Sequence, residues 1–182
     1  MRTLIILAHP TLDKSVINHA WLKALAASDL EVTVHRLYDA YPNGGPLDVE
    51  AEQALVRAHD LIVWQFPFYW FSTPPLLKQW QDEVLTHDFA YGHAEGQRQL
   101  AGKRIAMAIS AGIKQEDYLD SGRYRYSLDE LLRPLQVTIR YIDALAVKPW
   151  VFYGAEHDID LTQLEENAQG YVNYLRQLTQ AA

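Results

Sequence analysis

A short, continuously apolar segment near the middle of the chain limits the fold more than any other feature. Residues 61–64 read Leu-Ile-Val-Trp, without the polar alternation of a strand that faces water on one side. Such a run is typical of a strand covered on both faces, as in a parallel sheet between two layers of helices. Pro67 ends the run, and Pro74 and Pro75 then suit the first turn of a helix. The segment therefore predicts a strand–loop–helix unit of an α/β fold.

Strand patterns and helical patterns alternate along the whole chain. The strands, rich in Val, Ile and Leu, are expected at residues 3–8, 31–36, 60–66, 104–110 and 146–152. Helical spacing appears at residues 15–27, 49–58, 74–86, 127–144 with a break or bend at Pro134, and 161–178. This order predicts a doubly wound five-stranded parallel sheet with helices on both faces, formed by a single domain over residues 1–182.

Charge and composition argue against several classes of function. The formal net charge is -7 and no basic stripe is present, so nucleic-acid binding is not expected. The absence of cysteine excludes disulfides, thiolate nucleophiles and Cys-type zinc sites. Glu156-His157-Asp158 is more typical of a solvated helix cap than of a metal site. Because neither a signal peptide nor an apolar run approaching ~18 residues is evident, a cytoplasmic protein is the default expectation.

The loops after the first, third and fourth predicted strands converge on one edge of such a sheet, where ligands bind. The first loop, from His9 to Asn18, leads into a helix N-terminus that favours an anion such as phosphate. Ser15 and Asn18 add side-chain donors, and His9 or Lys14 can add positive charge. A simple helix cap at Ser15 and local packing of His9 would use the same residues. The loop has neither the dinucleotide glycine pattern nor that of a P-loop.

The second loop is aromatic, and the third is built from small residues. Phe68, Tyr69, Trp70 and Phe71 offer stacking faces to a flat ligand, although a core or a subunit interface would use them equally well. Ser110-Ala111-Gly112 lets backbone N–H groups come close to a ligand, as would an ordinary turn. The three loops together predict a site for a flat ring joined to a phosphate.

This combination resembles the flavodoxin-fold NAD(P)H:quinone oxidoreductases. The matching marks are His9-Pro10 with Ser15 and Asn18, the segment 67–80, and the loop 110–112. Residues 89–92 and 100–103, which read Phe-Ala-Tyr-Gly and Leu-Ala-Gly-Lys, are especially similar to the ancillary flavoprotein subunits of glutathione-gated potassium efflux systems. The resemblance spans nearly the whole chain and implies a flavodoxin-like fold.

The resemblance also implies a flavin, and FMN rather than FAD, because longer family members add a C-terminal tail that this chain lacks. The phosphate and ribityl groups would be held by His9, Ser15, Val16, Ile17 and Asn18. The ring would be surrounded by Pro67, Phe68, Tyr69, Trp70, Phe71, Ser110, Ala111, Gly112 and Ile113.

The implied activity is a ping-pong reaction in which NADPH or NADH gives a hydride to the flavin, and a quinone or similar electrophile then receives both electrons. Tyr118 matches the family's catalytic tyrosine, whereas Tyr124 stands where the best-studied members have a histidine. Ile113 replaces a frequent second glycine. The alternative is a flavin-bearing regulatory subunit of a membrane potassium-efflux transporter. In both cases we expect a homodimer in which residues 89–103 of one chain complete the site of the other.

Overall fold

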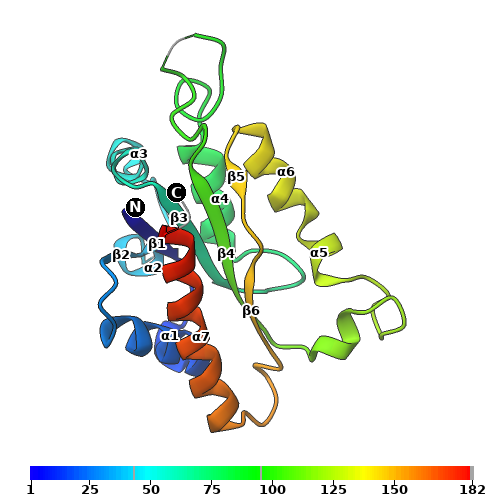
Figure 1. Ribbon diagram of the computed structural model, residues 1–182. Coiled ribbons are helices and arrows are strands. Elements are labelled where there is room, and N and C mark those ends of the chain that lie inside the picture. Colours follow the sequence, from blue (N-terminus) through cyan, green and yellow to red (C-terminus); the bar gives the residue numbers. More distant parts are fainter. Residues whose placement is uncertain (43, 95, 181–182) are drawn as a thin grey trace.

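The computed structural model describes residues 1–42, 44–94 and 96–180. One parallel sheet runs through the molecule in the order β2-β1-β3-β4-β5, with β6 also paired to β4 (Figure 1). The strands are β1 (Thr3–Leu7), β2 (Val32–Arg36), β3 (Leu61–Pro67), β4 (Arg104–Ala111), β5 (Leu145–Ala146) and β6 (Trp150–Tyr153). The predicted doubly wound parallel sheet is confirmed, and the strand order changes direction between β1 and β3.

The last strand differs from its prediction. Instead of one strand over residues 146–152, the structure has two short strands, β5 and β6, that both pair in parallel with β4. The N–H of Val147 still donates to the carbonyl of Ile105 at 3.0 Å. The following Pro149 has no N–H to donate, so the ladder is interrupted before β6 begins. An edge position tolerates this interruption because no further strand depends on it.

Helices cover both faces of the sheet, as predicted. On one face lie α1 (Val16–Ala26) and α7 (Leu161–Gln180); on the other lie α2 (Leu37–Ala40), α3 (Val49–Ala58), α4 (Pro75–Val84), α5 (Leu128–Leu131) and α6 (Arg133–Tyr141). The helical pattern over residues 127–144 is therefore interrupted just before Pro134, as expected. The sequence patterns did not indicate α2 or the two short 3-10 helices, η1 (Leu12–Lys14) and η2 (Gln115–Tyr118).

Side chains of β3 alternate between the two halves of the core. Ile62, Trp64 and Phe66 pack on the α2–α6 side, and Leu61 and Val63 pack on the α1–α7 side. All five are fully buried, which confirms a strand covered on both faces. The next residue on the α1–α7 side is Gln65, a polar side chain that is also fully buried. A buried amide requires hydrogen-bond partners, and Gln65 finds them beneath the candidate site.

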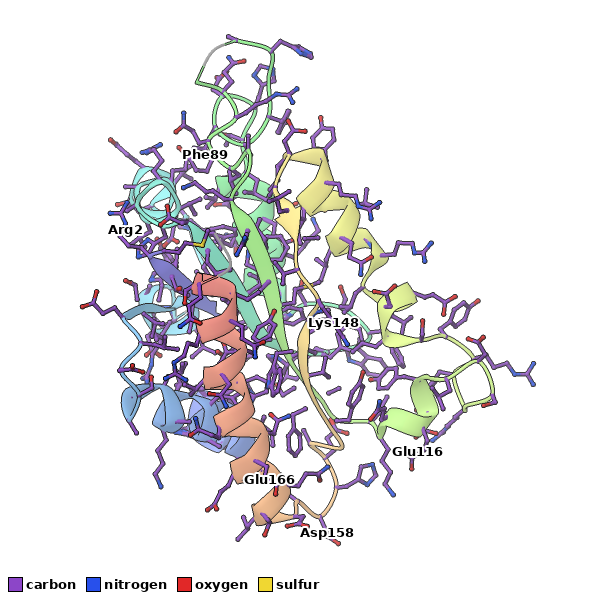
Figure 2. All side chains as sticks on the ribbon, in the orientation of Figure 1. Arg2, Phe89, Glu116, Lys148, Asp158 and Glu166 are labelled. Atoms are coloured by element: carbon purple, nitrogen blue, oxygen red, sulfur yellow. The ribbon has the colours of Figure 1, made fainter. Side chains whose placement is uncertain are left out.

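The segment 87–103 lies at the edge of the sheet where β4 begins, opposite the edge where it ends (Figure 1). Figure 2 labels Phe89 at one end of the molecule and Glu116 and Asp158 at the other. Phe89, Ala90 and Leu100 are buried in this chain's own core. The base of the segment is therefore structural, whereas its tip projects from the body of the molecule; Glu95 is not among the described residues. Within the described part of the chain, no helix has the length and apolar character needed to cross a bilayer.

Candidate functional site

A hollow lies at the carboxyl edge of the sheet, among the loops that follow β1, β3, β4 and β6. One part, the α1 pocket, holds about 240 Å³ and is lined by residues that include His9, Thr11, Ser15, Val16, Ile17 and Ser110. The other part, the aromatic pocket, holds about 590 Å³ and is lined by residues that include Trp70, Phe71, Ile113, Tyr118 and Tyr124. The two parts are continuous because Phe68, Tyr69, Gly112 and Glu156 line both. Ligands of doubly wound folds bind at this switch between β1 and β3.

The α1 pocket is built around the start of a helix. Ser15 is the N-cap of α1, and its Oγ accepts the backbone N–H of Asn18 at 3.2 Å. The N–H groups of Val16 and Ile17 have no intrahelical acceptor, as at every helix start. Lys14 adds an exposed positive charge at the rim. Helix dipole, free N–H groups and lysine all favour a bound anion here.

His9 contributes a donor to this pocket and no charge. Its side chain is 9 % exposed, and its Nδ1 accepts the backbone N–H of Thr11 at 3.2 Å. Burial, followed by the electrostatic effect of nearby His19, lowers the pKa of His9. The ring is therefore neutral at neutral pH and carries its hydrogen on Nε2. The sequence left open whether His9 or Lys14 adds positive charge, and the structure leaves that role to Lys14.

The aromatic pocket rests on a strained turn. The N–H of Ser72 donates to the carbonyl of Tyr69 at 2.9 Å, which brings Trp70 and Phe71 to φ values of 48° and 61°. Left-handed backbone costs roughly 1–2 kcal/mol per residue for side chains of this kind. The turn nevertheless holds Trp70 with 94 % of its side chain exposed. Backbone strain at a residue whose aromatic side chain is exposed is characteristic of a functional site.

Tyr118 closes the back of the aromatic pocket and is only 3 % exposed. Its ring lies 5.7 Å from that of Tyr153 and 6.4 Å from that of Tyr124. Burial, with smaller contributions from Tyr153, Tyr124, Glu156 and Asp117, raises the pKa of Tyr118 to about 12. Its hydroxyl is therefore protonated at neutral pH and has a proton to donate. Tyr124 packs on Phe71 at 5.3 Å and lies under the guanidinium of Arg123.

Most of the residues predicted for the site line this hollow. Asn18 and Ala111 do not, because both are fully buried behind its wall. Thr11, Ala155 and Glu156 were missed, and no local pattern singles them out. Glu156 is exposed, as expected of a solvated residue, and in addition its N–H donates to the carbonyl of Gly112 at 3.3 Å and its side chain lies over that glycine. Among the described residues, no group of three or more His, Asp or Glu side chains could hold a metal.

Trp70→Ala should separate stacking from folding. Because Trp70 is almost fully exposed, its removal takes little from the core, and we expect a thermal midpoint within about 2 °C of wild type. Loss of one stacking face should weaken the binding of FMN, the flavin that the resemblance implies, by about tenfold, measured by fluorescence titration. Tyr126→Ala is the matched control, since Tyr126 is an aromatic 58 % exposed outside the hollow. Equal FMN affinity in the Trp70 variant and wild type would contradict a stacking role.

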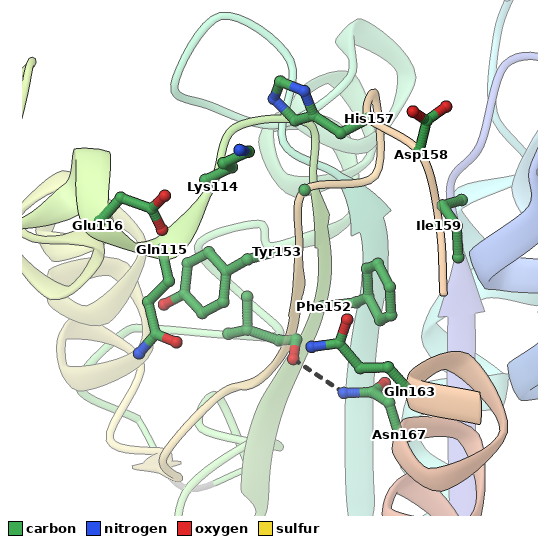
Figure 3. Close-up of a pocket in the computed structure, with 12 residues that line it drawn as sticks. Lys114, Gln115, Glu116, Phe152, Tyr153, His157, Asp158, Ile159, Gln163 and Asn167 are labelled. Carbon is green, nitrogen blue, oxygen red and sulfur yellow. Dashed lines mark hydrogen bonds between the residues drawn. The ribbon is translucent and has the colours of Figure 1, made fainter. Parts of the chain in front are cut away.

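A second hollow, of about 480 Å³, opens beside the site between η2 and the start of α7 (Figure 3). Lys114, Glu116, His157 and Asp158 stand around it, so charges of both signs meet there. At its base, Asn167 donates to the carbonyl of Val151 at 3.2 Å, and its Oδ1 accepts the indole N–H groups of Trp21 and Trp150. With mixed charge at the rim and a satisfied amide below, we assign no ligand to this hollow.

Comparison with known proteins agrees with the geometry. A family model described as "Flavodoxin-like fold" matches residues 1–175. The chain belongs to this flavodoxin-like family. Among its relatives is the "Uncharacterized NAD(P)H oxidoreductase YrkL" of Bacillus subtilis, 44% identical over 176 residues that cover 97% of this chain and 98% of that protein. Another is the glutathione-regulated potassium-efflux system ancillary protein KefG of Cronobacter sakazakii, 39% identical over 96% of this chain and 92% of the relative.

Two solved flavodoxin-like structures resemble this chain over almost its full length. General stress protein 14 of Treponema denticola, solved in complex with FMN, is 42% identical, with a TM-score of 0.89 and coverage of 98% of this chain and 99% of that chain. An NADPH-quinone reductase from P. pentosaceus is 30% identical, with a TM-score of 0.84 and coverage of 96% and 97%. The predicted resemblance to the flavodoxin-fold quinone oxidoreductases and to the potassium-efflux ancillary subunits is confirmed.

Proposed function

We propose that this protein is an FMN-dependent NAD(P)H oxidoreductase that passes two electrons to quinones or similar electrophiles. The observation that carries the proposal is the union of an anion-binding helix start with an aromatic pocket in one hollow. FMN joins a phosphate to a flat ring and therefore fits both parts. Further support comes from two relatives. One, 42% identical, was solved in complex with FMN, and the other, 44% identical, is named as an NAD(P)H oxidoreductase.

The residues of the hollow fit FMN in three ways. Ser15, His9 and the first N–H groups of α1 would bind the phosphate, with Lys14 supplying positive charge. Gly112 has no side chain, and the space above it holds only the exposed side chain of Glu156, which would turn aside for a ring between the aromatic loop and the loop after β4. Trp70 and Phe71 would cover the ring and exclude water. FMN, when bound, supplies the hydride chemistry by which NAD(P)H and a quinone become NAD(P)⁺ and a hydroquinone, with one proton taken from solvent.

Tyr118 is the residue of this chain that we place at the reaction. Its hydroxyl keeps its proton at neutral pH because its pKa is raised to about 12. It can therefore donate a hydrogen bond to the ring where negative charge develops on reduction. Tyr124, at 6.4 Å between ring centres, stands at the position where the best-studied family members have a histidine. We infer that Tyr118 acts without an imidazolium partner.

The visible absorption spectrum tests the proposal. Purified protein, or protein mixed with FMN and desalted, should show flavin bands that bleach when NADPH or NADH is added without oxygen. Adding a quinone should restore them. Mass analysis of the released cofactor separates FMN from FAD. A colourless protein that takes up no FMN would overturn the proposal.

A regulatory role is the second candidate, because a relative 39% identical is named as an ancillary protein of a potassium-efflux system. In this role the chain would bind the cytoplasmic part of a transporter and its own turnover would be slow. Co-purification with a transporter and a change in potassium efflux would support it. Rapid NAD(P)H oxidation with quinone and no transporter binding would favour the enzyme alone.

A homodimer is also part of the proposal. Segment 87–103 stands at the edge of the sheet opposite this chain's own hollow, which makes it available to the site of another copy (Figure 1). The buried base, with Phe89 and Leu100, restricts that contribution to the tip. Light scattering should give twice the chain mass of 20.9 kDa. A mass equal to one chain would contradict the dimer.

A further inference from the structure

Three fully buried polar side chains form a hydrogen-bonded chain from the C-terminal helix to the candidate site. The hydroxyl of Tyr171 on α7 donates to Oε1 of Gln65 on β3 at 3.0 Å. Nε2 of Gln65 donates to Oδ1 of Asn18 on α1 at 2.8 Å. Nδ2 of Asn18 then donates to the Oγ atoms of Ser15 and Ser110, at 2.9 and 3.3 Å. Only the two serines reach the hollow, where both line the α1 pocket.

The direction of this chain is set at its buried end. Each amide has one donor end and one acceptor end, so the orientation of one amide determines that of the next. The hydroxyl of Tyr171 is fully buried and, within the described residues, has Gln65 as its partner. Burial, followed by the charge of Tyr174, raises the pKa of Tyr171 well above its usual value, so the proton stays. Tyr171 must therefore donate, which turns the NH₂ group of Gln65 toward Asn18 and that of Asn18 toward the serines.

The consequence reaches the hydroxyl protons of the two serines. Ser15 Oγ accepts two N–H groups of Asn18, one from the backbone at 3.2 Å and one from the side chain at 2.9 Å. Ser110 Oγ accepts from the same amide. In the described part of the chain, neither hydroxyl donates to a protein acceptor. Both protons are therefore available to oxygen atoms of a ligand in the α1 pocket.

We propose that Tyr171 and Gln65 are positioning residues, which fix the direction of this hydrogen-bond chain so that Ser15 and Ser110 present donors to the bound cofactor. The inference rests on the proposed function, in which Ser15, the N-cap of α1, binds the phosphate of FMN. Neither Tyr171 nor Gln65 lines the hollow, so both act through Asn18. If the hydroxyl proton of Tyr171 is removed, the side-chain amides of Gln65 and Asn18 can rotate. The hydroxyls of Ser15 and Ser110 can then turn inward and donate to Asn18.

Tyr171→Phe tests this inference because it removes one oxygen and preserves the ring that packs on Trp21. A hydrogen bond to a charged group is worth about a tenfold to hundredfold change in affinity, so we expect FMN to bind at least about tenfold more weakly. Riboflavin has no phosphate and should lose less affinity, so the ratio of FMN to riboflavin affinity should fall. A purely structural role would weaken both flavins equally.

Tyr174→Phe is the matched control. Tyr174 lies on the same helix and stacks on Tyr171 at 6.4 Å. Its hydroxyl donates to the carbonyl of Lys148 at 2.7 Å and takes no part in the hydrogen bonds that lead to the serines. Its FMN to riboflavin ratio should equal that of wild type. Gln65→Met, which breaks the chain in the middle with a side chain of similar volume, is a second variant with the same expectation as Tyr171→Phe. In a Ser15→Ala background, Tyr171→Phe should lose most of its effect on FMN.

The outcomes separate this inference from the proposed function. If wild type binds FMN, and Tyr171→Phe and Gln65→Met both keep its ratio of FMN affinity to riboflavin affinity, the positioning role is overturned and the proposed function stands. Full additivity of Ser15→Ala and Tyr171→Phe would also overturn it. A wild-type protein that binds neither flavin would overturn the proposed function, and the inference with it.

Discussion

Gly112→Val should abolish most FMN binding while leaving the fold intact. Gly112 lines both parts of the hollow, so a side chain there occupies space that the ring would use. A Cβ at this position would lie 2.5 Å from Cδ and 2.7 Å from Oε1 of Glu156. Because Glu156 is exposed and flexible, it can move aside at little cost to folding. We expect FMN affinity to fall by about 100-fold, measured by fluorescence titration, with a nearly unchanged melting midpoint.

Glu156→Ala and the double variant identify the cause of that loss. If Glu156→Ala binds FMN well and Gly112→Val/Glu156→Ala does not, the added side chain itself blocks the ring. Recovery of FMN binding in the double variant would instead show that displaced Glu156 was the obstacle. Normal FMN affinity in Gly112→Val would place the ring elsewhere and contradict the proposed site.

Glu52→Ala should produce the largest loss of stability. The side chain of Glu52, 2 % exposed, accepts hydrogen bonds from His35, Tyr41 and Trp80, each at 2.8 Å. These contacts join β2, the end of α2, α3 and α4. Its removal leaves the buried indole N–H of Trp80 and the partly buried donors of His35 and Tyr41 without this acceptor, a loss of about 3–5 kcal/mol. The melting midpoint, followed by circular dichroism, should fall by about 10 °C.

Glu50→Ala on the exposed side of the same helix is the control, and its melting midpoint should be close to that of wild type.

The pH dependence of stability gives a second test of Glu52. Burial alone would raise the pKa of Glu52, but the hydrogen bonds from His35, Trp80 and Tyr41 outweigh it and lower that pKa. This stabilisation is fully present above the unfolded value of about 4.3 and is lost as pH falls through the lower folded value. The difference in melting midpoint between wild type and Glu52→Ala should therefore become smaller only in strong acid. A difference in melting midpoint that does not vary with pH would contradict an ionised Glu52.

The backbone plan was predictable because it depends on local patterns. The run Leu61 to Trp64 indicated a strand buried on both faces, and Pro134 marked the break between α5 and α6. Pro67 and Pro74 likewise limited the aromatic loop, so Trp70 and Phe71 were expected at the edge of the sheet. Their left-handed φ values were not, since nothing in an aromatic side chain indicates such backbone.

Long-range contacts decided the rest. The sequence by itself determined the alternation of strands and helices, the anion-favouring helix start and the aromatic loop, because spacing, prolines and caps act within one or two turns. Only the tertiary structure brought Tyr171 to Gln65, 106 residues away, and folded Glu156 over Gly112. Partners of this kind are set by strand register and by helix packing across the sheet, and the sequence near each residue carries no signal for them.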